Sequence, residues 1–417
     1  MNQYKKHFMT EFNKYCKDYT YTPFILPAVE RIVVFGDIHG DYKLAVSLLL
    51  ISKVAKIIGE SDDDENSVSS IEKDYEIKKS KKYKMKWIGG KTHVVQVGDQ
   101  LDRCRVYGNL TCDLPQTTLH DENSDIKIME LFTDLHEQAV KVGGAVISLL
   151  GNHEINNAMG ILTYVSAKGL EGFKNYKDPN DQNIKFNSGY DARKHAFKPG
   201  NEYGRYMGCT RLPAVIIGSN LFAHAGIVDE LLEQQNEKNN KDNKDNIDEF
   251  KLNYDSKYFN KKIFYFKDRE DFENVNIVIK RWLMGIVKEN KVTDIVSSKY
   301  QERSMFWNRI LGMLKTNLPY ERESCKDNLD KVMKLFRVKN LIIGHTPQSM
   351  QDGLYINATC GDRVWRVDTA SSAAFDRFDE TYISSGNRLE TRKFQYLVIE
   401  NDTKYNICFE DKCQRAN

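Results

Sequence analysis

Short apolar runs recur along the chain, and most of them stop at a glycine that is followed by polar residues. Short continuous apolar runs bounded by such breaks are typical of buried β-strands. We therefore predict strands near residues 31–35, 92–97, 145–150, 214–218, 220–226 and 340–345.

Between these runs, apolar residues recur every three or four positions, which indicates helices that pack on a sheet. The pattern predicts helices over 42–57, 124–142, 275–287, 297–314 and 327–336. Asp41 and Ser124 stand where helix N-caps are expected. Further strands are predicted at 394–400 and 404–410. Strands that alternate with helices predict an α/β fold.

Two segments are too polar to form a core. Residues 59–86 change from acidic to basic, and residues 233–262 are rich in asparagine and lysine. We interpret both as surface insertions. Residues 1–27 form a polar, aromatic lead-in, and residues 28–417 are predicted to form a single domain that carries these insertions. The insertions explain how the chain exceeds the usual limit of about 250–300 residues for one core.

Composition excludes several classes of protein. The 61 Lys and Arg residues nearly balance the 59 Asp and Glu residues, so nucleic acid and acidic membranes are not expected partners. No apolar run is long enough to span a bilayer, and the first residues lack the apolar region of a signal peptide. The eight cysteines include no C-x-x-C pair, which favours reduced thiols and a cytoplasmic location.

The polar residues after the strands form the strongest signal. In open α/β sheets, ligands bind beyond the carboxyl ends of the strands. A single histidine at a strand end is usually structural, but five such clusters together would be costly to bury without a cation. The clusters contain Asp37, His39, Asp99, Asp102, Arg103, Asn152, His153, His224 and His345.

These groups supply too many ligands for one tetrahedral ion and about enough for two ions that share a carboxylate. Imidazole mixed with oxygen ligands favours Mn, Fe or Zn over Mg or Ca. Two such ions can clamp an in-line displacement and generate hydroxide near neutral pH, so we expect phosphoryl hydrolysis. The expected metal ligands are Asp37, His39, Asp99, Asn152, His224 and His345.

The motifs GDIHG, GDQLDR, GNHE, HAG and GHTPQ, in this order, resemble the calcineurin-like metallophosphoesterases and their phosphoprotein phosphatase branch. The longer runs LLGNHEINNAMGILTYV, GRYMG, LPAVIIGSNLFAHAGI, FWNR and RVDTASSA are similar to the Shewanella-like protein phosphatases. The resemblance covers residues 31–374 and implies a central β-sandwich of mixed sheets flanked by helices, in α/β/β/α layers.

The resemblance also implies roles for individual residues. Asp37 and His39 would bind the first metal, Asp99 would bridge, and Asn152, His224 and His345 would complete the second. His153 would be the general acid, oriented by Asp102. Arg103 and Asn152 would hold phosphate oxygens, and the second phosphate-binding arginine would be Arg309 or, failing that, Arg205. The expected substrate is a phosphorylated protein or peptide, attacked by metal-bound hydroxide at phosphoserine, phosphothreonine or phosphotyrosine.

Two rival functions stay open at this point. Dinucleoside-polyphosphate hydrolases share the GDxHG and HAG motifs but usually read GNHD, whereas this chain reads GNHE. A catalytically silent phosphopeptide-binding scaffold would usually have lost a ligand or the general acid, and both are present here. Asp368, in RVDTASS, is expected to be a structural residue rather than a ligand.

Overall fold

The computed structural model describes residues 3–58, 84–232, 266–289, 292–299, 304–348, 355–378, 394–409 and 412–415. Almost all of the insertion predicted at 59–86, and all of the one predicted at 233–262, lie outside these ranges. Within the described residues, no helix is both long and apolar enough to cross a membrane.

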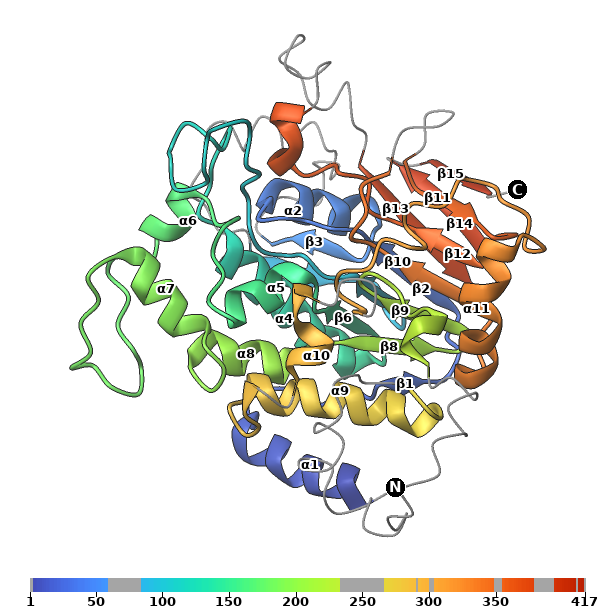
Figure 1. Ribbon diagram of the computed structural model, residues 1–417, viewed down its shortest axis with the longest axis horizontal. Coiled ribbons are helices and arrows are strands. Elements are labelled where there is room, and N and C mark those ends of the chain that lie inside the picture. The colour runs from blue at the N-terminus through green and yellow to red at the C-terminus, as the bar shows by residue number, and fades with distance from the viewer. Residues whose placement is uncertain are drawn as a thin grey trace.

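Two mixed β-sheets form the centre of the molecule (Figure 1). The first sheet has the order β15-β14-β13-β2-β5-β6-β7, and the second has the order β1-β8-β9-β10-β12-β11. Strands of the first sheet are β2 (Arg31–Phe35), β5 (His93–Gln96), β6 (Ala145–Leu149), β7 (Arg211–Leu212), β13 (Gln395–Glu400), β14 (Lys404–Phe409) and β15 (Lys412–Arg415). Strands of the second sheet are β1 (Ile25–Leu26), β8 (Ala214–Ile217), β9 (Asn220–Ala223), β10 (Asn340–Ile343), β11 (Asn357–Thr359) and β12 (Val364–Arg366). A separate small ribbon pairs β3 (Ala55–Ile57) with β4 (Met85–Trp87).

The strands that precede the polar clusters run parallel within each sheet. In the first sheet β2, β5 and β6 are parallel neighbours, with Val33 opposite Val94 and Val94 opposite Val146. In the second sheet β9 and β10 are parallel, with Leu221 opposite Leu341. Parallel neighbours end at the same edge of a sheet, so each sheet presents its polar clusters together.

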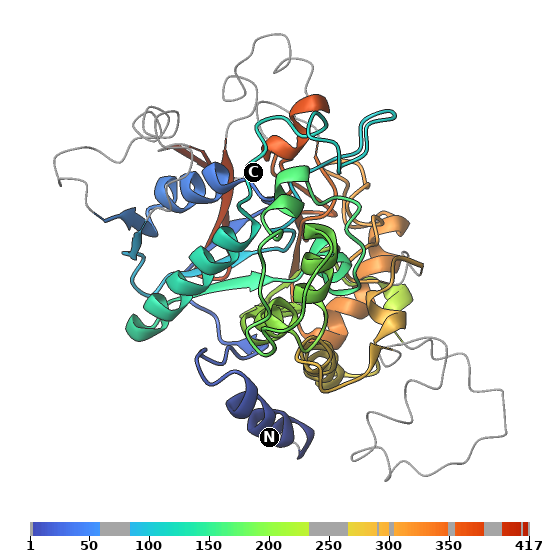
Figure 2. The ribbon, with the colours of Figure 1, turned by 90° about the vertical axis from the view of Figure 1, so that its left-hand side faces the viewer.

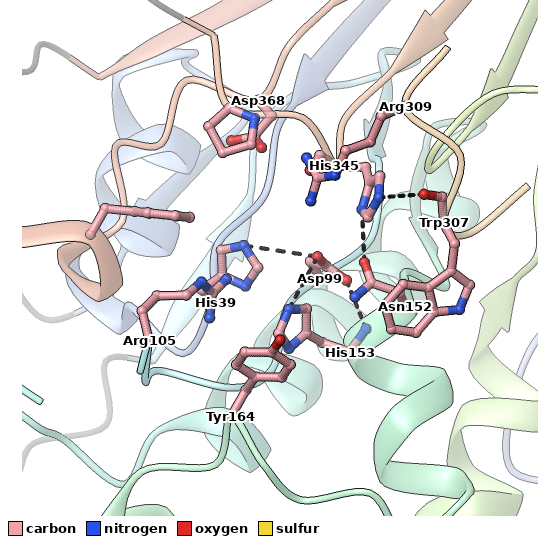
Figure 3. A pocket seen from close by; sticks show the side chains of 12 residues that line it. His39, Asp99, Arg105, Asn152, His153, Tyr164, Trp307, Arg309, His345 and Asp368 are labelled. Carbon is pink, nitrogen blue, oxygen red and sulfur yellow. Dashed lines mark hydrogen bonds and ion pairs between the residues drawn. The ribbon is translucent and has the colours of Figure 1, made fainter. Parts of the chain in front are cut away.

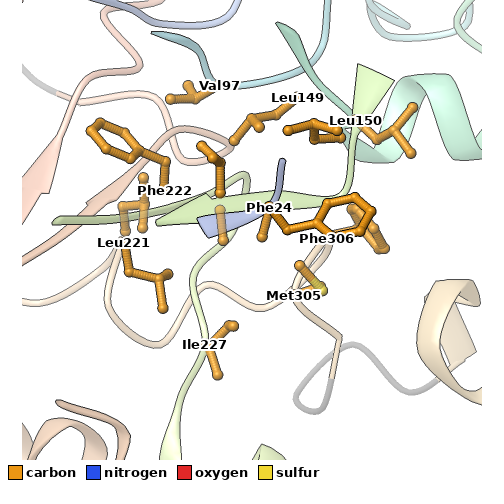
Figure 4. Packing of buried hydrophobic residues seen from close by; sticks show 14 of the residues in the cluster. Phe24, Val97, Leu149, Leu150, Leu221, Phe222, Ile227, Met305 and Phe306 are labelled. Carbon is orange, nitrogen blue, oxygen red and sulfur yellow. The ribbon is translucent and has the colours of Figure 1, made fainter. Parts of the chain in front are cut away.

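Both faces of β2 are buried, which explains its unbroken apolar sequence. Ile32 and Val34 belong to the cluster that lies between the two sheets, whereas Val33 and Phe35 belong to a second cluster beneath helices α2 and α4. Figure 4 shows part of the first cluster, where Leu149 of β6 and Phe222 of β9 meet between the sheets.

Helices cover the outer faces of the sheets, giving the predicted α/β/β/α layers (Figures 1 and 2). On the outer side of the second sheet, α9 is tied to β8 because the Asn276 side chain accepts a hydrogen bond from the Ala214 N–H at 3.0 Å. The helices are α1 (Gln3–Tyr15), α2 (Tyr42–Ile51), α4 (Asp125–Ala139), α5 (Asn152–Ala158), α6 (Ala167–Glu171), α7 (Gly189–Phe197), α8 (Glu202–Thr210), α9 (Arg269–Leu283), α10 (Thr293–Val296) and α11 (Glu323–Phe336).

The predicted helices over 124–142, 275–287 and 327–336 are present with shifted ends, as α4, α9 and α11. The helix predicted over 42–57 ends at Ile51, because the chain turns through a left-handed Lys53 into β3. Asp41 caps α2 as predicted, accepting a hydrogen bond from the Leu44 N–H at 2.9 Å. Ser124 occupies the N-cap position of α4 but makes no capping bond, and its hydroxyl donates to the Gly40 carbonyl instead.

The prediction of a helix over 297–314 is wrong for the described residues 304–314, which form a series of turns. Side chains bond to distant backbone groups here: Asn308 donates to the Gly226 carbonyl at 3.0 Å, and the Trp307 indole donates to the Val296 carbonyl at 3.1 Å. A side chain at Gly312 would lie 2.2 Å from Thr346, so only glycine permits this close approach.

The expectation of reduced thiols is also wrong, because the structure pairs all eight cysteines in disulfides. They are Cys16–Cys209, Cys104–Cys112, Cys325–Cys360 and Cys408–Cys413. Spacing along the chain did not reveal these pairs, because the partners meet only in the folded structure, up to 193 residues apart. The inference of a reducing compartment loses its support with this result.

Candidate metal and phosphate site

Five strands of the two sheets deliver their polar residues to one place (Figure 3). Asp37 and His39 follow β2, Asp99 follows β5, Asn152 and His153 follow β6, His224 follows β9, and His345 follows β10. All of them except Asp37 and His224 line a cavity of about 260 Å³, which we call the catalytic cavity. His224 lies behind Asn152, with its Nε2 2.9 Å from Asn152 Oδ1. The structure therefore brings together all the residues that the sequence indicated as metal ligands.

The backbone at these strand ends adopts an uncommon conformation. His39, Asp99, Asp102 and His345 have φ values of 47°, 54°, 70° and 66°. This left-handed region costs a non-glycine residue of order 1 kcal/mol or more, and such residues cluster at functional sites. Each strand thus turns sharply at its end and directs a side chain into the cluster.

The potential ligands form two overlapping groups. His39, Asp99 and His153 make up one group, and Asp99, His224 and His345 make up the other, with the ligand atoms of each group within 4.8 Å of one another. Asp99 belongs to both groups, which is the position of a bridging carboxylate. Its Oδ2 lies 3.8 Å from His39 Nε2 and 3.3 Å from His224 Nε2.

Three histidines each direct one ring nitrogen to a backbone carbonyl. His224 Nδ1 lies 2.9 Å from the Val97 carbonyl, His345 Nε2 lies 3.0 Å from the Trp307 carbonyl, and His39 Nδ1 lies 3.4 Å from the Leu101 carbonyl. A carbonyl only accepts, so these nitrogens donate, and in a neutral ring the other nitrogen presents a lone pair to the cluster. Metal-binding histidines are typically oriented in this way.

Acceptor atoms face one another within the cluster, which fits a cation. Asn152 Oδ1 lies 2.9 Å from both His224 Nε2 and His345 Nδ1, and all three atoms carry lone pairs when the two rings are neutral. Asp37 Oδ1 and Asp368 Oδ2 are buried without a hydrogen-bond donor among the described residues. Positive charge between these atoms would satisfy them, so the residues fit a site for metal ions.

Burial and neighbouring charges shift the pKa values of the residues in the cluster. Burial, with Asp368 and Asp99 nearby, raises the pKa of Asp37 well above its usual value. Burial alone would raise the pKa of Asp99 as well, but the His224 and His153 rings outweigh it and hold that pKa well below its usual range. Burial lowers the pKa of His39 far below that of a free histidine, and nearby Arg105 adds to this effect.

His153 and Asp102 form a pair at the wall of the catalytic cavity. His153 Nδ1 donates to Asp102 Oδ2 at 2.8 Å, which leaves Nε2 available for proton transfer or for a metal ion. Asp102 is itself held by Asn157, whose amide donates to Oδ1 at 2.9 Å. Arg193, which is fully buried on α7, lies 3.4 Å from the same oxygen and 2.7 Å from Asp125 Oδ2. The orientation of His153 therefore depends on a buried network that extends away from the cavity.

The arginines differ from the sequence-based expectation. The Arg103 guanidinium donates to the Gly40 carbonyl at 3.0 Å and to Glu122 at 2.9 Å, and Arg103 does not line the catalytic cavity. Arg205 also lies outside the cavity lining and donates to the Gly200 carbonyl at 2.6 Å. The structure therefore does not bring either guanidinium into the catalytic cavity.

Two other arginines line the catalytic cavity. Arg309 lies there as predicted and donates to the His345 carbonyl at 3.1 Å. Arg105, which the sequence reasoning missed, lies 4.8 Å from the centre of the Phe375 ring and 5.7 Å from that of Tyr164. In Figure 3 the two arginines approach Asp99 from different sides.

Glu154 is a second residue that the sequence reasoning passed over, although it ends the GNHE motif. Its carboxylate accepts hydrogen bonds from the N–H groups of Gly151, Asp99 and Gln100 at 2.7, 2.9 and 2.8 Å. It thereby joins the loop after β5 to the loop after β6 and fixes the backbone at Asp99. The only sequence signal for this role was the place of Glu154 in the GNHE motif, because its buried carboxylate acts through backbone N–H groups.

A model of the calcineurin-like phosphoesterase family matches residues 30–349. The chain therefore belongs to the calcineurin-like phosphoesterases, and its mixed α/β fold agrees with that assignment.

Among curated proteins, the chain is 31% identical over 296 residues to the uncharacterised protein R398 of Acanthamoeba polyphaga mimivirus, covering 68% of this chain and 100% of the relative. It is 27% identical to Shewanella-like protein phosphatase 1 of Plasmodium berghei, over 84% of this chain and 70% of the relative. A crystal structure of the cold-active protein-tyrosine phosphatase of a psychrophilic Shewanella species superimposes with a TM-score of 0.55 and 16% identity, covering 95% and 83% of the two chains. This structural likeness supports the fold.

Proposed function

We propose that this phosphoesterase is a metal-dependent phosphatase that removes phosphate from proteins or peptides. The observation that carries the proposal is the cluster of facing lone pairs around Asp99, His224, His345 and Asn152, directly beneath a cavity with two arginines. Asp37, His39, Asp99, Asn152, His224 and His345 would hold two ions of Mn, Fe or Zn. Such ions polarise phosphoryl oxygens and lower the pKa of water toward neutral values.

The remaining steps belong to the protein's own side chains. Arg105 and Arg309 bind the phosphate oxygens, because each guanidinium offers planar N–H donors at the cavity wall. His153 delivers a proton from Nε2 to the departing oxygen, and Asp102 keeps the opposite nitrogen protonated. Proton transfer of this kind contributes about 10²–10⁴ in rate.

The aromatic wall supports phosphotyrosine as a substrate. Tyr164 lies 5.0 Å from the His153 ring, and Phe375 lies 5.5 Å from the His39 ring, so both flank the reacting position. Offset or edge-to-face contact with a substrate phenyl ring is favourable by about 0.5–1.5 kcal/mol. A serine or threonine phosphate has no ring to make this contact.

Two substitutions separate the roles in the site. We expect Asp99→Asn to abolish activity and to lower the metal content, because Asp99 belongs to both ligand groups. We expect His153→Asn to keep the metal while kcat falls about 10²–10⁴-fold. Both variants are assayed with p-nitrophenyl phosphate, and bound metal is quantified by mass spectrometry. A loss of metal in His153→Asn would instead make His153 a ligand and overturn its role as the acid.

A substrate panel tests the proposed class. Phosphotyrosine, phosphothreonine and phosphoserine peptides of one sequence are compared with diadenosine tetraphosphate. The proposal expects turnover of the peptides, fastest for phosphotyrosine, and little turnover of the dinucleotide. Preferred cleavage of diadenosine tetraphosphate would favour a dinucleoside-polyphosphate hydrolase, and the absence of metal-dependent turnover on every substrate would favour a binding scaffold.

A further inference from the structure

A second cavity, of about 360 Å³, lies at the opposite end of the sheets from the catalytic cavity. Strand β10 runs from this cavity, at Asn340, to the residue before the Gly344–His345 turn. Its parallel neighbour β12 starts beside Arg363, which lines the second cavity, and leads to Asp368 at the first. Strands of this length separate the two cavities by roughly 15 Å.

The turn between β13 and β14 completes the second cavity from the other sheet. Asp402, Thr403 and Lys404 line it. This turn lies beyond the start of β2, because Glu400 of β13 pairs with Arg31. The cavity is therefore a crevice between the two sheets, at the edge where no metal-ligand residue lies.

Positive charge dominates the lining of this crevice. It contains the basic residues Lys339, Arg363, Lys404 and Arg415, against the acidic residues Asp362 and Asp402. The Asp402 carboxylate already accepts hydrogen bonds from the Ser219 N–H at 3.0 Å and from the Asn220 side chain at 2.7 Å. Among the described residues, no side-chain partner exists for Lys339, Lys404 or Arg415.

Aromatic rings hold the wall of the crevice in place. Trp365 stacks on Tyr405 with ring centres 4.9 Å apart and an angle of 7°, and the Tyr405 hydroxyl donates to Asn220. Arg363 lies 3.7 Å from the centre of the Tyr320 ring. The N–H groups at Trp365 Nε1 and Arg363 Nε are buried and have no acceptor among the described residues. Unsatisfied buried donors cost about 1–3 kcal/mol each, which an anionic ligand would relieve.

The geometry points to a binding site for a small, multiply charged phosphate compound, of which diphosphate is the simplest. The crevice has unpaired cations, fixed aromatic walls and donors without acceptors, and its volume lies at the lower end of the range for small-molecule pockets. The inference concerns binding of the anion by these cationic and N–H groups. This inference is independent of the substrate proposed for the catalytic cavity.

Calorimetric titration of the full chain with diphosphate tests the inference. We expect one binding event outside the catalytic cavity, weakened about tenfold or more by Lys404→Glu or by Arg415→Glu, since each removes one charge-assisted contact. Lys412→Glu is the matched control, because Lys412 is exposed on β15, outside the crevice lining, and makes the same charge change. Unchanged turnover of p-nitrophenyl phosphate verifies that each variant is folded.

Diphosphate can also enter the catalytic cavity, so the titration is repeated with Arg309→Met. The crevice site is expected to persist in that variant. Equal binding by wild type, Lys404→Glu and Arg415→Glu would overturn the inference, as would the absence of any binding that survives Arg309→Met. Titration with ADP and AMP then separates the sources: equal affinity for ADP and diphosphate indicates recognition of the phosphates alone, whereas tighter ADP binding indicates that the nucleoside is contacted too.

Discussion

Arg105 lies beside two aromatic rings at the wall of the catalytic cavity, where we propose that it binds phosphate. We expect Arg105→Met to lower kcat/KM by about 10²-fold, as is typical when one donor to developing negative charge is removed. Arg205→Met is the control, because Arg205 lies outside the cavity lining. Steady-state kinetics with p-nitrophenyl phosphate decides the point, and equal losses in both variants would contradict it.

Arg193 positions His153, the proposed general acid, from outside the lining of the catalytic cavity. Its guanidinium connects Asp125 to Asp102, which in turn holds His153. We expect Arg193→Met to slow the hydrolysis of an alkyl phosphate by about tenfold more than that of p-nitrophenyl phosphate, because nitrophenolate departs without needing a proton. Partial recovery in Arg193→Lys would support the electrostatic link. A uniform loss on both substrates would indicate a structural role only.

The positions of some site residues could be predicted from the sequence. His39 and Asp99 were expected at the cavity because each belongs to a short motif at a strand end, where the topology fixes the direction of the side chain. The sequence did not show which of Arg103 and Arg105 lines the cavity. Arg103 pairs with Glu122 and Arg105 lines the cavity, and this arrangement depends on a loop whose course no local pattern encodes.

At the scale of elements, the loop between β5 and α4 contains the Cys104–Cys112 disulfide. Apart from a bridge between Tyr107 and Leu110, this loop has no regular structure, and the disulfide is a covalent constraint on its course. Cys104 directly precedes Arg105, and its N–H donates to the Tyr164 carbonyl at 3.1 Å. The disulfide thus fixes the backbone that directs Arg105 into the catalytic cavity.

We therefore expect the double variant Cys104→Ala/Cys112→Ala to raise KM and lower kcat/KM by about tenfold, since misplacing a substrate-binding group is costly to rate. The variant Cys408→Ala/Cys413→Ala is the matched control, because that disulfide lies between β14 and β15, away from the site. Kinetics and metal content are measured for both. Similar kinetics in the two variants would show that the loop keeps its shape without the disulfide.

Strands and amphipathic helices were predictable where burial alone sets the pattern, as in β2, α4 and α11. The segment from 304 to 314 could not be predicted in this way. Its apolar residues recur at helical spacing, but they lie on a series of turns. Trp307 and Arg309 reach the catalytic cavity only through those turns. Side chain-to-backbone bonds that replace helical bonds depend on partners far away in the sequence, such as Gly226.

At the scale of the whole molecule, stability depends on pH through a buried lysine. Lys280 of α9 is fully enclosed and donates to the Arg211 carbonyl at 2.8 Å. Burial, with some repulsion from Arg211, lowers its pKa to about 7. An unfolded lysine titrates near 10.4, so between these values the unfolded chain binds more protons, and its free energy of unfolding rises with pH.

We expect this lysine to add up to about 1.4 kcal/mol per pH unit to the free energy of unfolding between pH 7 and pH 10. Urea unfolding of the wild type and of Lys280→Met, measured in parallel across this range, isolates the contribution as a difference. The wild-type curve should rise more steeply with pH than that of the variant. Parallel curves would contradict a lowered pKa for Lys280.

The layered architecture followed from the alternation of strands and helices, whereas the order of strands did not. Strand β13, close to the end of the described chain, lies between β14 and β2, with Leu397 opposite Val34. Pairing across more than 360 positions leaves no local signal in a sequence, because any apolar strand of suitable length would fit beside β2.

This arrangement has a consequence for synthesis on the ribosome. Until β13 has emerged, β2 is an unprotected edge, and open edges of apolar strands readily join other chains. The strand that delivers Asp37 and His39 gains its second neighbour only after about 360 further residues have been made. Translation that halts before residue 395 would therefore release a fragment in which the edge of β2 is open to pairing with other chains.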